Sequence, residues 1–146
     1  MNFARVAASA LAAWAVSIPV GYVVNEILLK ELYTANAAAM RPQEAIMANV
    51  PLGFVATLVG FFVFAYMYAK GYEGTNGPLE GVRFGVLVAL LVCCFAIVWQ
   101  YVVYPISGPM LAAMVIDVIV ETALYGAIVG AIYKPTARQA YNVVPV

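Results

Sequence analysis

Two carboxylates, Asp117 and Glu121, lie near the middle of a hydrophobic stretch that runs from Met110 to Tyr133 and contains no basic residue. A charge at such a depth in a bilayer costs roughly 2.5–3.5 kcal/mol on insertion scales. Intramembrane acids therefore usually face a bundle interior or a water-filled cavity, where they mark functional sites. Residues four apart share one face of a helix, and Tyr125 continues the same row. We take this row as the centre of the candidate site.

Other hydrophobic stretches carry polar side chains at a depth that matches the carboxylate row. At a rise of 1.5 Å per residue, Asp117 lies about 12 Å inside its stretch and Glu121 about 18 Å. The polar residues on the same side of the membrane midplane as Asp117 are Asn25, Glu26, Asn49, Gln100 and Tyr101. Together with Tyr125 they predict a polar pocket that opens toward the outer face of the membrane, with Glu121 at its floor.

Three interpretations of this polar cluster stay open at the level of sequence. In the structural one, the carboxylates are hydrogen-bond partners that fix helix register or meet a basic residue of a partner protein. In the transport one, they form a cation or proton site, as intramembrane carboxylates often do. In the enzymatic one, they act as general acid and base, or as oxygen ligands of a hard cation such as Mg²⁺ or Ca²⁺.

The composition indicates that the chain lies in a lipid bilayer. Of its 146 residues, 66% are hydrophobic and 10% are charged, whereas a soluble domain has about 45–50% apolar and about 25% charged residues. Seven basic residues balance seven acidic ones. Nucleic acid is excluded as an expected partner, because binding it needs a clustered basic surface.

The absence of histidine removes several classes of site. Haem bound through histidine, the usual zinc sites and the commonest general base all need that side chain. The cysteines Cys93 and Cys94 are adjacent, whereas a metal or redox pair is more often spaced C-x-x-C. The carboxylates have no recognised metal-ligand spacing. We therefore expect no metal, no cofactor and no catalytic residue.

Four stretches are long enough for a membrane-spanning helix, which needs about 20 mostly apolar residues. They are expected at residues 6–29, 45–69, 79–104 and 109–133, with a short tail at 134–146. Because the first stretch can span the membrane, we interpret it as a retained helix rather than a signal peptide. The prediction is an all-α fold: a four-helix transmembrane bundle with short loops, in which residues 1–146 form a single transmembrane domain.

The basic residues predict the orientation of these helices, because cytoplasmic loops carry an excess of lysine and arginine. If the N-terminus is cytoplasmic, five basic residues lie on that side: Arg5, Lys70, Arg83, Lys134 and Arg138. Lys30 and Arg41 lie on the opposite side. We therefore expect a multi-pass protein with both termini cytoplasmic.

Glycines at four-residue spacing predict where two helices meet. Gly81 and Gly85 open the third stretch, and Gly126 and Gly130 close the fourth. In the expected topology both pairs lie in the cytoplasmic half, at matching depth. Since small residues let helix backbones approach closely in a membrane, the third and fourth helices are expected to contact each other there.

The segment from Glu80 to Gly85 and the pattern D-x₃-E-x₃-Y-G-x₃-G-x₂-Y from Asp117 to Tyr133 together carry a resemblance. They resemble small uncharacterised bacterial four-helix integral membrane proteins. The resemblance implies a bundle in the bacterial inner membrane. It implies no activity and transfers no catalytic residue.

A 146-residue bundle has little room for a translocation path of its own. We therefore predict a non-catalytic accessory subunit of a larger membrane complex, in which the carboxylates make polar contacts between helices or subunits. The alternatives are a small oligomeric ion or proton transporter that uses Asp117 and Glu121, and an intramembrane enzyme acting on lipid or quinone. The expected partners are the lipid bilayer and other membrane protein subunits, or further copies of the chain.

Overall fold

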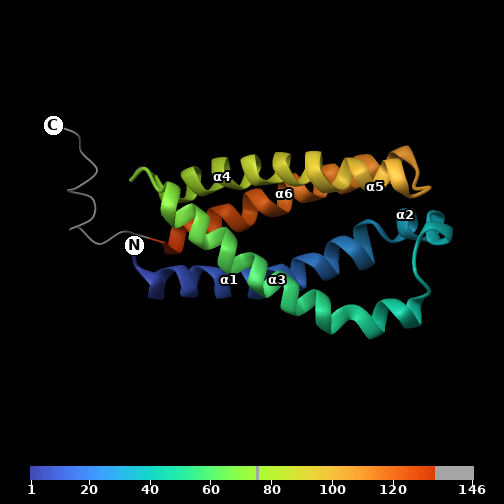
Figure 1. Cartoon of the computed structure of the whole chain (residues 1–146), viewed down its shortest axis with the longest axis horizontal. Helices are drawn as coiled ribbons and strands as arrows, with labels where there is room; N and C mark the ends of the chain where they lie inside the picture. Colours follow the sequence, from blue (N-terminus) through green and yellow to red (C-terminus); the bar gives the residue numbers. More distant parts are fainter. Residues whose placement is uncertain (75, 134–146) are drawn as a thin grey trace.

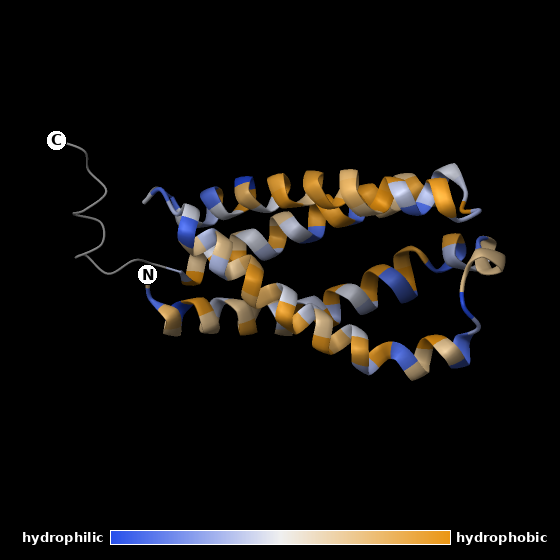
Figure 2. Cartoon of the chain, viewed as in Figure 1, coloured by the Kyte–Doolittle hydropathy of each residue, from blue (hydrophilic) through white to orange (hydrophobic). Residues whose placement is uncertain are grey.

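The computed structural model describes residues 1–74 and 76–133, and its regular structure is all helical (Figure 1). Four helical stretches are long and apolar enough to cross a membrane: Phe3–Leu28, Gln43–Gly71, Gly77–Val103 and Gly108–Ile132. The all-α bundle is confirmed, and each stretch begins and ends within three residues of its predicted bounds. Hydrophobic residues dominate the middle of the long helices (Figure 2). The predicted tail, with Lys134 and Arg138, lies outside the described residues.

The first half of the chain contains two of the four stretches. Helix α1 (Phe3–Tyr22) continues into a π-helical segment, η1 (Val23–Leu28), and then into the short helix α2 (Lys30–Ala35). A single 3₁₀ turn, η2 (Ala37–Ala39), precedes the long helix α3 (Gln43–Gly71). The connection between the first two stretches is therefore itself mostly helical.

The second half forms a helical hairpin. Helix α4 (Gly77–Val92), the π-helical segment η3 (Cys93–Ile97) and α5 (Val98–Val103) follow one another without a break. After a short turn, α6 (Gly108–Ile132) runs back along them. The side chain of Ser107 caps α6 by accepting a hydrogen bond from the backbone N–H of Met110, at 3.3 Å, which satisfies one of the unpaired donors of a helix N-terminus.

The bundle has two ends with different packing (Figure 1). At one end α1 begins, α3 ends, α4 begins and α6 ends. We call it the glycine end, after Gly77, Gly81, Gly126 and Gly130. At the other end lie α2 and the turn between α5 and α6, and we call it the α2 end. The start of α1 and the end of α6 are on the same side, as an even number of spans requires.

Helices α4 and α6 pack at the glycine end with their backbones in contact. A Cβ added at Gly81 would overlap the carbonyl of Gly126, and a Cβ added at Gly126 would overlap the carbonyl of Gly81. The same reciprocal overlap joins Gly77 to Gly130, and a Cβ at Gly85 would meet the backbone of α6. The two stretches of spaced glycines thus lie against each other. Such close approach provides the van der Waals contact on which helix association in lipid depends.

Aromatic side chains pack the second half of α3 against the contact between α4 and α6 at the glycine end. Phe64 and Tyr68 both pack edge-on against Phe84 of α4, with ring centroids 4.8 and 5.6 Å apart. The ring of Tyr68 also lies 6.0 Å from that of Tyr133. The Tyr68 hydroxyl is 3.0 Å from the carbonyl oxygen of Gly77, to which it donates a hydrogen bond. The glycine end is therefore closed by both ring packing and a polar contact.

The helices diverge toward the α2 end. Figure 1 shows the first half of α3 running away from the hairpin of α4, α5 and α6. In the most apolar 18-residue window of the α3 stretch, 6% of residues are buried, against 22% for α6. A loop contact joins the two halves of the chain at this end: the side-chain oxygen of the buried Asn36 accepts a hydrogen bond from the Ser107 N–H, at 2.7 Å.

Candidate functional site

The carboxylate row lies along α6, on the part of the helix that precedes Gly126 and Gly130. Asp117 and Glu121 are both half-buried. The hydroxyl of Tyr125 donates a hydrogen bond to Oε2 of Glu121, at 2.9 Å. The ring of Phe61, from α3, packs edge-on against Tyr125 at 5.0 Å. Glu121 is thus fixed where α3 closes on α6. Among the residues that the structure describes, Asp117 has no hydrogen-bond partner.

A tyrosine that the sequence does not single out, Tyr33 of α2, connects this row to the first helix. Its hydroxyl donates a hydrogen bond to Oδ1 of Asn25, at 2.7 Å. Burial raises the pKa of the Tyr33 phenol, and the negative charges of Asp117 and Glu121 raise it further. Both carboxylates therefore lie within electrostatic reach of Tyr33. From its residue type and its position in the sequence alone, Tyr33 is expected to be an aromatic residue at the membrane interface.

The π-helical segment η1 orients Asn25. It follows Pro19, which removes one backbone donor from α1, and it closes with a hydrogen bond from the Leu29 N–H to the Val24 carbonyl, at 2.8 Å. The side-chain amide of Asn25 donates to the carbonyl of Gly21 at 2.7 Å, while its oxygen accepts from Tyr33. Insertions of this kind are frequent at functional sites because they redirect side chains.

Other members of the predicted cluster lie apart from the carboxylate row. Asn49 is exposed on the diverging half of α3, and its amide donates to the carbonyl of Ala45 in its own helix, at 2.7 Å. Glu26 is exposed on η1, and Tyr101 is 44% exposed on α5. The side-chain hydrogen bonds within the site thus join Asn25 with Tyr33, and Glu121 with Tyr125.

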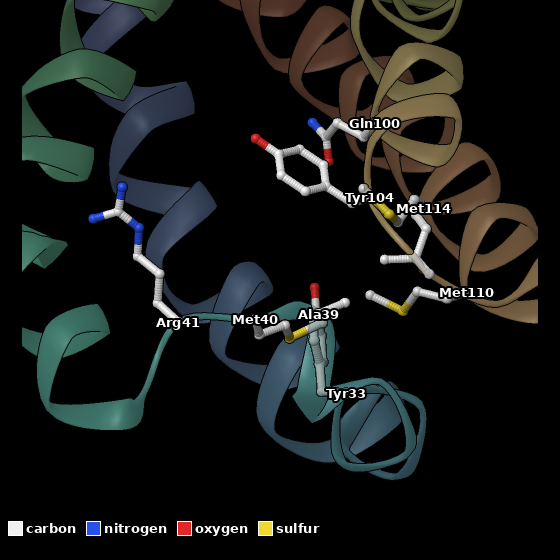
Figure 3. A pocket seen from close by; sticks show the side chains of 9 residues that line it. Tyr33, Ala39, Met40, Arg41, Gln100, Tyr104, Met110 and Met114 are labelled. Atoms are coloured by element: carbon white, nitrogen blue, oxygen red, sulfur yellow. The ribbon is translucent and has the colours of Figure 1, made fainter.

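A cavity of about 380 Å³ lies at the α2 end (Figure 3), within the range of about 300–1,000 Å³ that is usual for ligand pockets. The residues that line it are Tyr33, Ala39, Met40, Arg41, Gln100, Tyr104, Ile106, Met110 and Met114. In Figure 3, Gln100 and Tyr104 project from the hairpin side toward the connection that carries Tyr33 and Arg41. Of the predicted cluster, Gln100 lines this cavity, whereas Glu121 does not form its floor.

The cavity wall and the carboxylates share one face of α6. Met110, Met114, Asp117 and Glu121 follow one another at steps of four, three and four residues, which is the spacing of a single helical stripe. Along this face, the two methionines that line the cavity are followed by the two carboxylates. Tyr33 is related to both, because it lines the cavity and the charges of the two carboxylates raise the pKa of its phenol.

The described residues also bear on metal and thiol chemistry. In residues 1–74 and 76–133, no group of three or more His, Cys, Asp or Glu side chains is placed to hold a metal ion. Cys93 is buried, Cys94 is exposed, and both are free thiols. The chemistry that the site offers is therefore hydrogen bonding and charge, from carboxylates, phenols and amides.

Comparison with known proteins finds no matching family model, no matching curated protein and no matching solved structure. The function must be argued from the geometry of the chain itself.

Proposed function

We propose that this chain is a non-catalytic accessory subunit of a larger membrane assembly. The supporting observation is the first half of α3, which diverges from the rest of the bundle. An exposed stripe of small and polar residues begins on one face of this half and continues one turn beyond it: Asn49, Gly53, Thr57 and Gly60. A helix face that contacts only lipid tails needs no side-chain amides and no small residues. Interfaces between membrane helices, by contrast, are enriched in both small residues and polar side chains.

The α4–α6 seam indicates how such a stripe is used when a partner is present. There, glycines bring two backbones into contact. At Gly53 and Gly60, by contrast, an added Cβ would meet nothing within 4 Å. The side-chain amide of Asn49 donates to its own helix. Within the described part of the chain its amide oxygen accepts no hydrogen bond, so it can accept one from a neighbour. We infer that a helix from another subunit packs on this face.

The half-buried Asp117 supports the same proposal. A carboxylate taken partly out of water is stabilised by a hydrogen bond or an opposite charge. Within the described part of the chain Asp117 has neither. A donor supplied by the partner subunit would fill this role.

The proposal is tested by gentle purification of the native protein, followed by mass determination of the components that accompany it. Fixed-stoichiometry co-purification with larger subunits is expected for the wild type. Gly53→Leu should abolish it, because the new side chain occupies the proposed interface. The chain's own fold should be unchanged, since the space at Gly53 is open. The matched control is Val55→Phe, which enlarges a 60% exposed residue on the opposite face of α3 and should leave co-purification intact.

Two results would contradict the proposal. One is a Gly53→Leu protein that keeps its partners at the wild-type ratio. The other is a wild-type protein that purifies as a pure homo-oligomer, which would favour the transport alternative.

The second candidate function is a small oligomeric ion or proton transporter. It is favoured by the face of α6 on which Met110 and Met114 of the cavity wall precede Asp117 and Glu121. Ion flux in proteoliposomes should then disappear in Glu121→Gln. Absence of flux from pure, oligomeric protein would remove this candidate. The enzymatic alternative gains no support, because neither carboxylate lines the substrate-sized cavity.

The proposed location is the bacterial inner membrane, with both termini and the glycine end cytoplasmic. Support comes from Arg5, Lys70 and Arg83, which belong to the glycine end, while Lys30 and Arg41 belong to the α2 end. A membrane-impermeant maleimide should label a cysteine at Thr34 of α2 in intact spheroplasts, but not a cysteine at Gly71. The opposite labelling pattern would reverse the orientation.

A further inference from the structure

The cavity is lined by residues that lie both outside and inside the candidate membrane spans. Tyr33 and Arg41 lie between the first two candidate spans, Phe3–Leu28 and Gln43–Gly71. At 1.5 Å per residue, Met110 lies about 3 Å and Met114 about 9 Å inside the span of α6. The cavity therefore extends from the level of lipid headgroups into the level of hydrocarbon. An amphiphile held parallel to the bilayer lipids would match both parts.

The polar part of the cavity carries a positive charge. Arg41 is the charged member of the lining, and no acidic residue belongs to it. Its side chain is exposed and forms no ion pair within residues 1–74 and 76–133. A guanidinium presents several donors in a planar fork that fits two oxygens of a phosphate. The carboxylates Asp117 and Glu121 lie beyond the Met114 side, so an anionic group is favoured at Arg41 rather than deeper.

The apolar part is adaptable. Met40, Met110 and Met114 line it together with Ile106. Methionine side chains are unbranched and flexible, and they fit irregular apolar shapes without fixed geometry. The volume of about 380 Å³ accommodates a headgroup and the beginning of an acyl chain, while it is too small for a whole phospholipid. The remainder of such a ligand would lie in the bilayer.

We propose that this cavity binds one phospholipid from the leaflet at the α2 end, with its phosphate on Arg41 and the start of one acyl chain along Met110 and Met114. Gln100 and Tyr104, which project into the space between the two halves of the chain in Figure 3, face the glycerol and ester oxygens. This site is separate from the interface proposed on α3 and does not depend on it.

Native mass spectrometry of the purified full chain tests the proposal, with phosphatidylglycerol titrated into the detergent solution. One bound phosphatidylglycerol per chain is expected to survive at low lipid concentration. Arg41→Gln should weaken its apparent affinity about tenfold or more, because the lost hydrogen bonds involve two charged groups. The matched control is Lys30→Gln, which removes an exposed cation near the same end that does not line the cavity, and it should bind as the wild type does.

A second variant keeps the test independent of the charge. Ala39→Trp places a large ring in the cavity while Arg41 is retained, and it should also lose the bound lipid. Circular dichroism and gel filtration are expected to match the wild type for both variants, since Ala39 and Arg41 lie outside the packed helices. Loss of lipid by Lys30→Gln to the same extent as by Arg41→Gln would overturn the proposal.

Two further ligands separate the possible sources of a bound phosphate. Diacylglycerol, which lacks the phosphate, should bind at least about tenfold more weakly than phosphatidylglycerol. Equal binding of the two would overturn the role of Arg41. Millimolar inorganic phosphate should not displace the lipid, because it cannot use the apolar wall. Displacement by inorganic phosphate would identify a site for the free ion and overturn the proposal of a lipid.

Discussion

The two ends of this bundle use the same kinds of residue in opposite ways. At the glycine end, Gly81 and Gly126 bring the backbones of α4 and α6 into contact. On α3, by contrast, a Cβ added at Gly53 or Gly60 would meet nothing within 4 Å among the described residues. A glycine in a membrane helix thus marks a close approach only where a neighbour is present. The open glycines indicate a surface whose neighbour comes from outside the chain.

The polar groups show the same difference. Tyr68 at the glycine end donates to a backbone carbonyl of another helix, at 3.0 Å. Asn49 on the open half of α3 donates to its own helix, and Asp117 has no partner within the described residues. The contact that Tyr68 makes between helices thus has no counterpart at Asn49 or Asp117 within the described residues.

The largest effect is expected from Gly126→Leu. The new side chain would overlap the carbonyl of Gly81, and backbone in a helix cannot move aside as a flexible side chain can. Overpacking of a well-packed site costs about 1–3 kcal/mol, and we expect the upper part of this range or more. Unfolding in mixed micelles by added sodium dodecyl sulfate measures the free energy of unfolding. A loss below about 0.5 kcal/mol, which is the effect of an ordinary surface substitution, would contradict the close contact between α4 and α6.

The next effect is expected from Asn36→Ala at the α2 end. The substitution removes two hydrogen bonds of the buried Asn36 side chain, one accepted from the Ser107 N–H and one donated to the Leu32 carbonyl, and each such bond contributes about 0.5–1.5 kcal/mol. Hydrogen exchange should accelerate in α2 and in the turn before α6. Amides of α4 at the glycine end should exchange at their wild-type rate. Equal acceleration at both ends would show that the two ends do not open independently.

A smaller effect is expected from Tyr68→Phe. It keeps the aromatic packing and removes the hydrogen bond to Gly77, so the free energy of unfolding should fall by about 1 kcal/mol. The same micelle titration measures it. The matched control is Tyr66→Phe on an exposed side of α3, where the ring is 41% exposed. An equal change in both variants would assign the effect to the phenol in general rather than to the contact with α4.

The smallest effect concerns pH at the α2 end. The folded state raises the pKa of Tyr33 above its ordinary value, near 10. The unfolded chain therefore releases this proton first as pH rises, so the contribution of Tyr33 to stability is full below pH of about 10 and declines through the raised pKa. The difference in thermal midpoint between wild type and Tyr33→Phe should shrink as the pH rises above about 10. Parallel profiles would contradict the placement of Tyr33 beside the carboxylates.

The sequence carries enough information to locate the spans and the α4–α6 contact. The spans follow from the length of their apolar stretches, and the contact follows from glycines at a fixed spacing, which has few uses other than close approach. The helical period also places Asp117, Glu121 and Tyr125 on one row, and Tyr125 does donate to Glu121.

The divergence of α3 could not be read from the sequence. The helix is apolar along both halves, and since lipid tails are as apolar as leucine, hydropathy cannot distinguish a helix neighbour from lipid. The contribution of Tyr33 to the site also could not be predicted from the sequence. It depends on the π-helical segment η1 and on the fold of α2, which arise from local hydrogen bonding and leave no periodic pattern. Asn49 illustrates the first of these reasons, because its depth suits the cluster while it lies exposed on the diverging half of α3.

The most direct test of the open half of α3 is the environment of a spin label at Gly53→Cys, in a background with Cys93→Ala and Cys94→Ala. Collision with oxygen should be frequent in the purified chain reconstituted alone, because nothing in residues 1–74 and 76–133 lies within 4 Å of a Cβ at this position. In native membranes, where the proposed partner is present, the label should become immobilised and shielded from oxygen. Equal exposure in both preparations would contradict the account, since it would show that lipid alone covers this face.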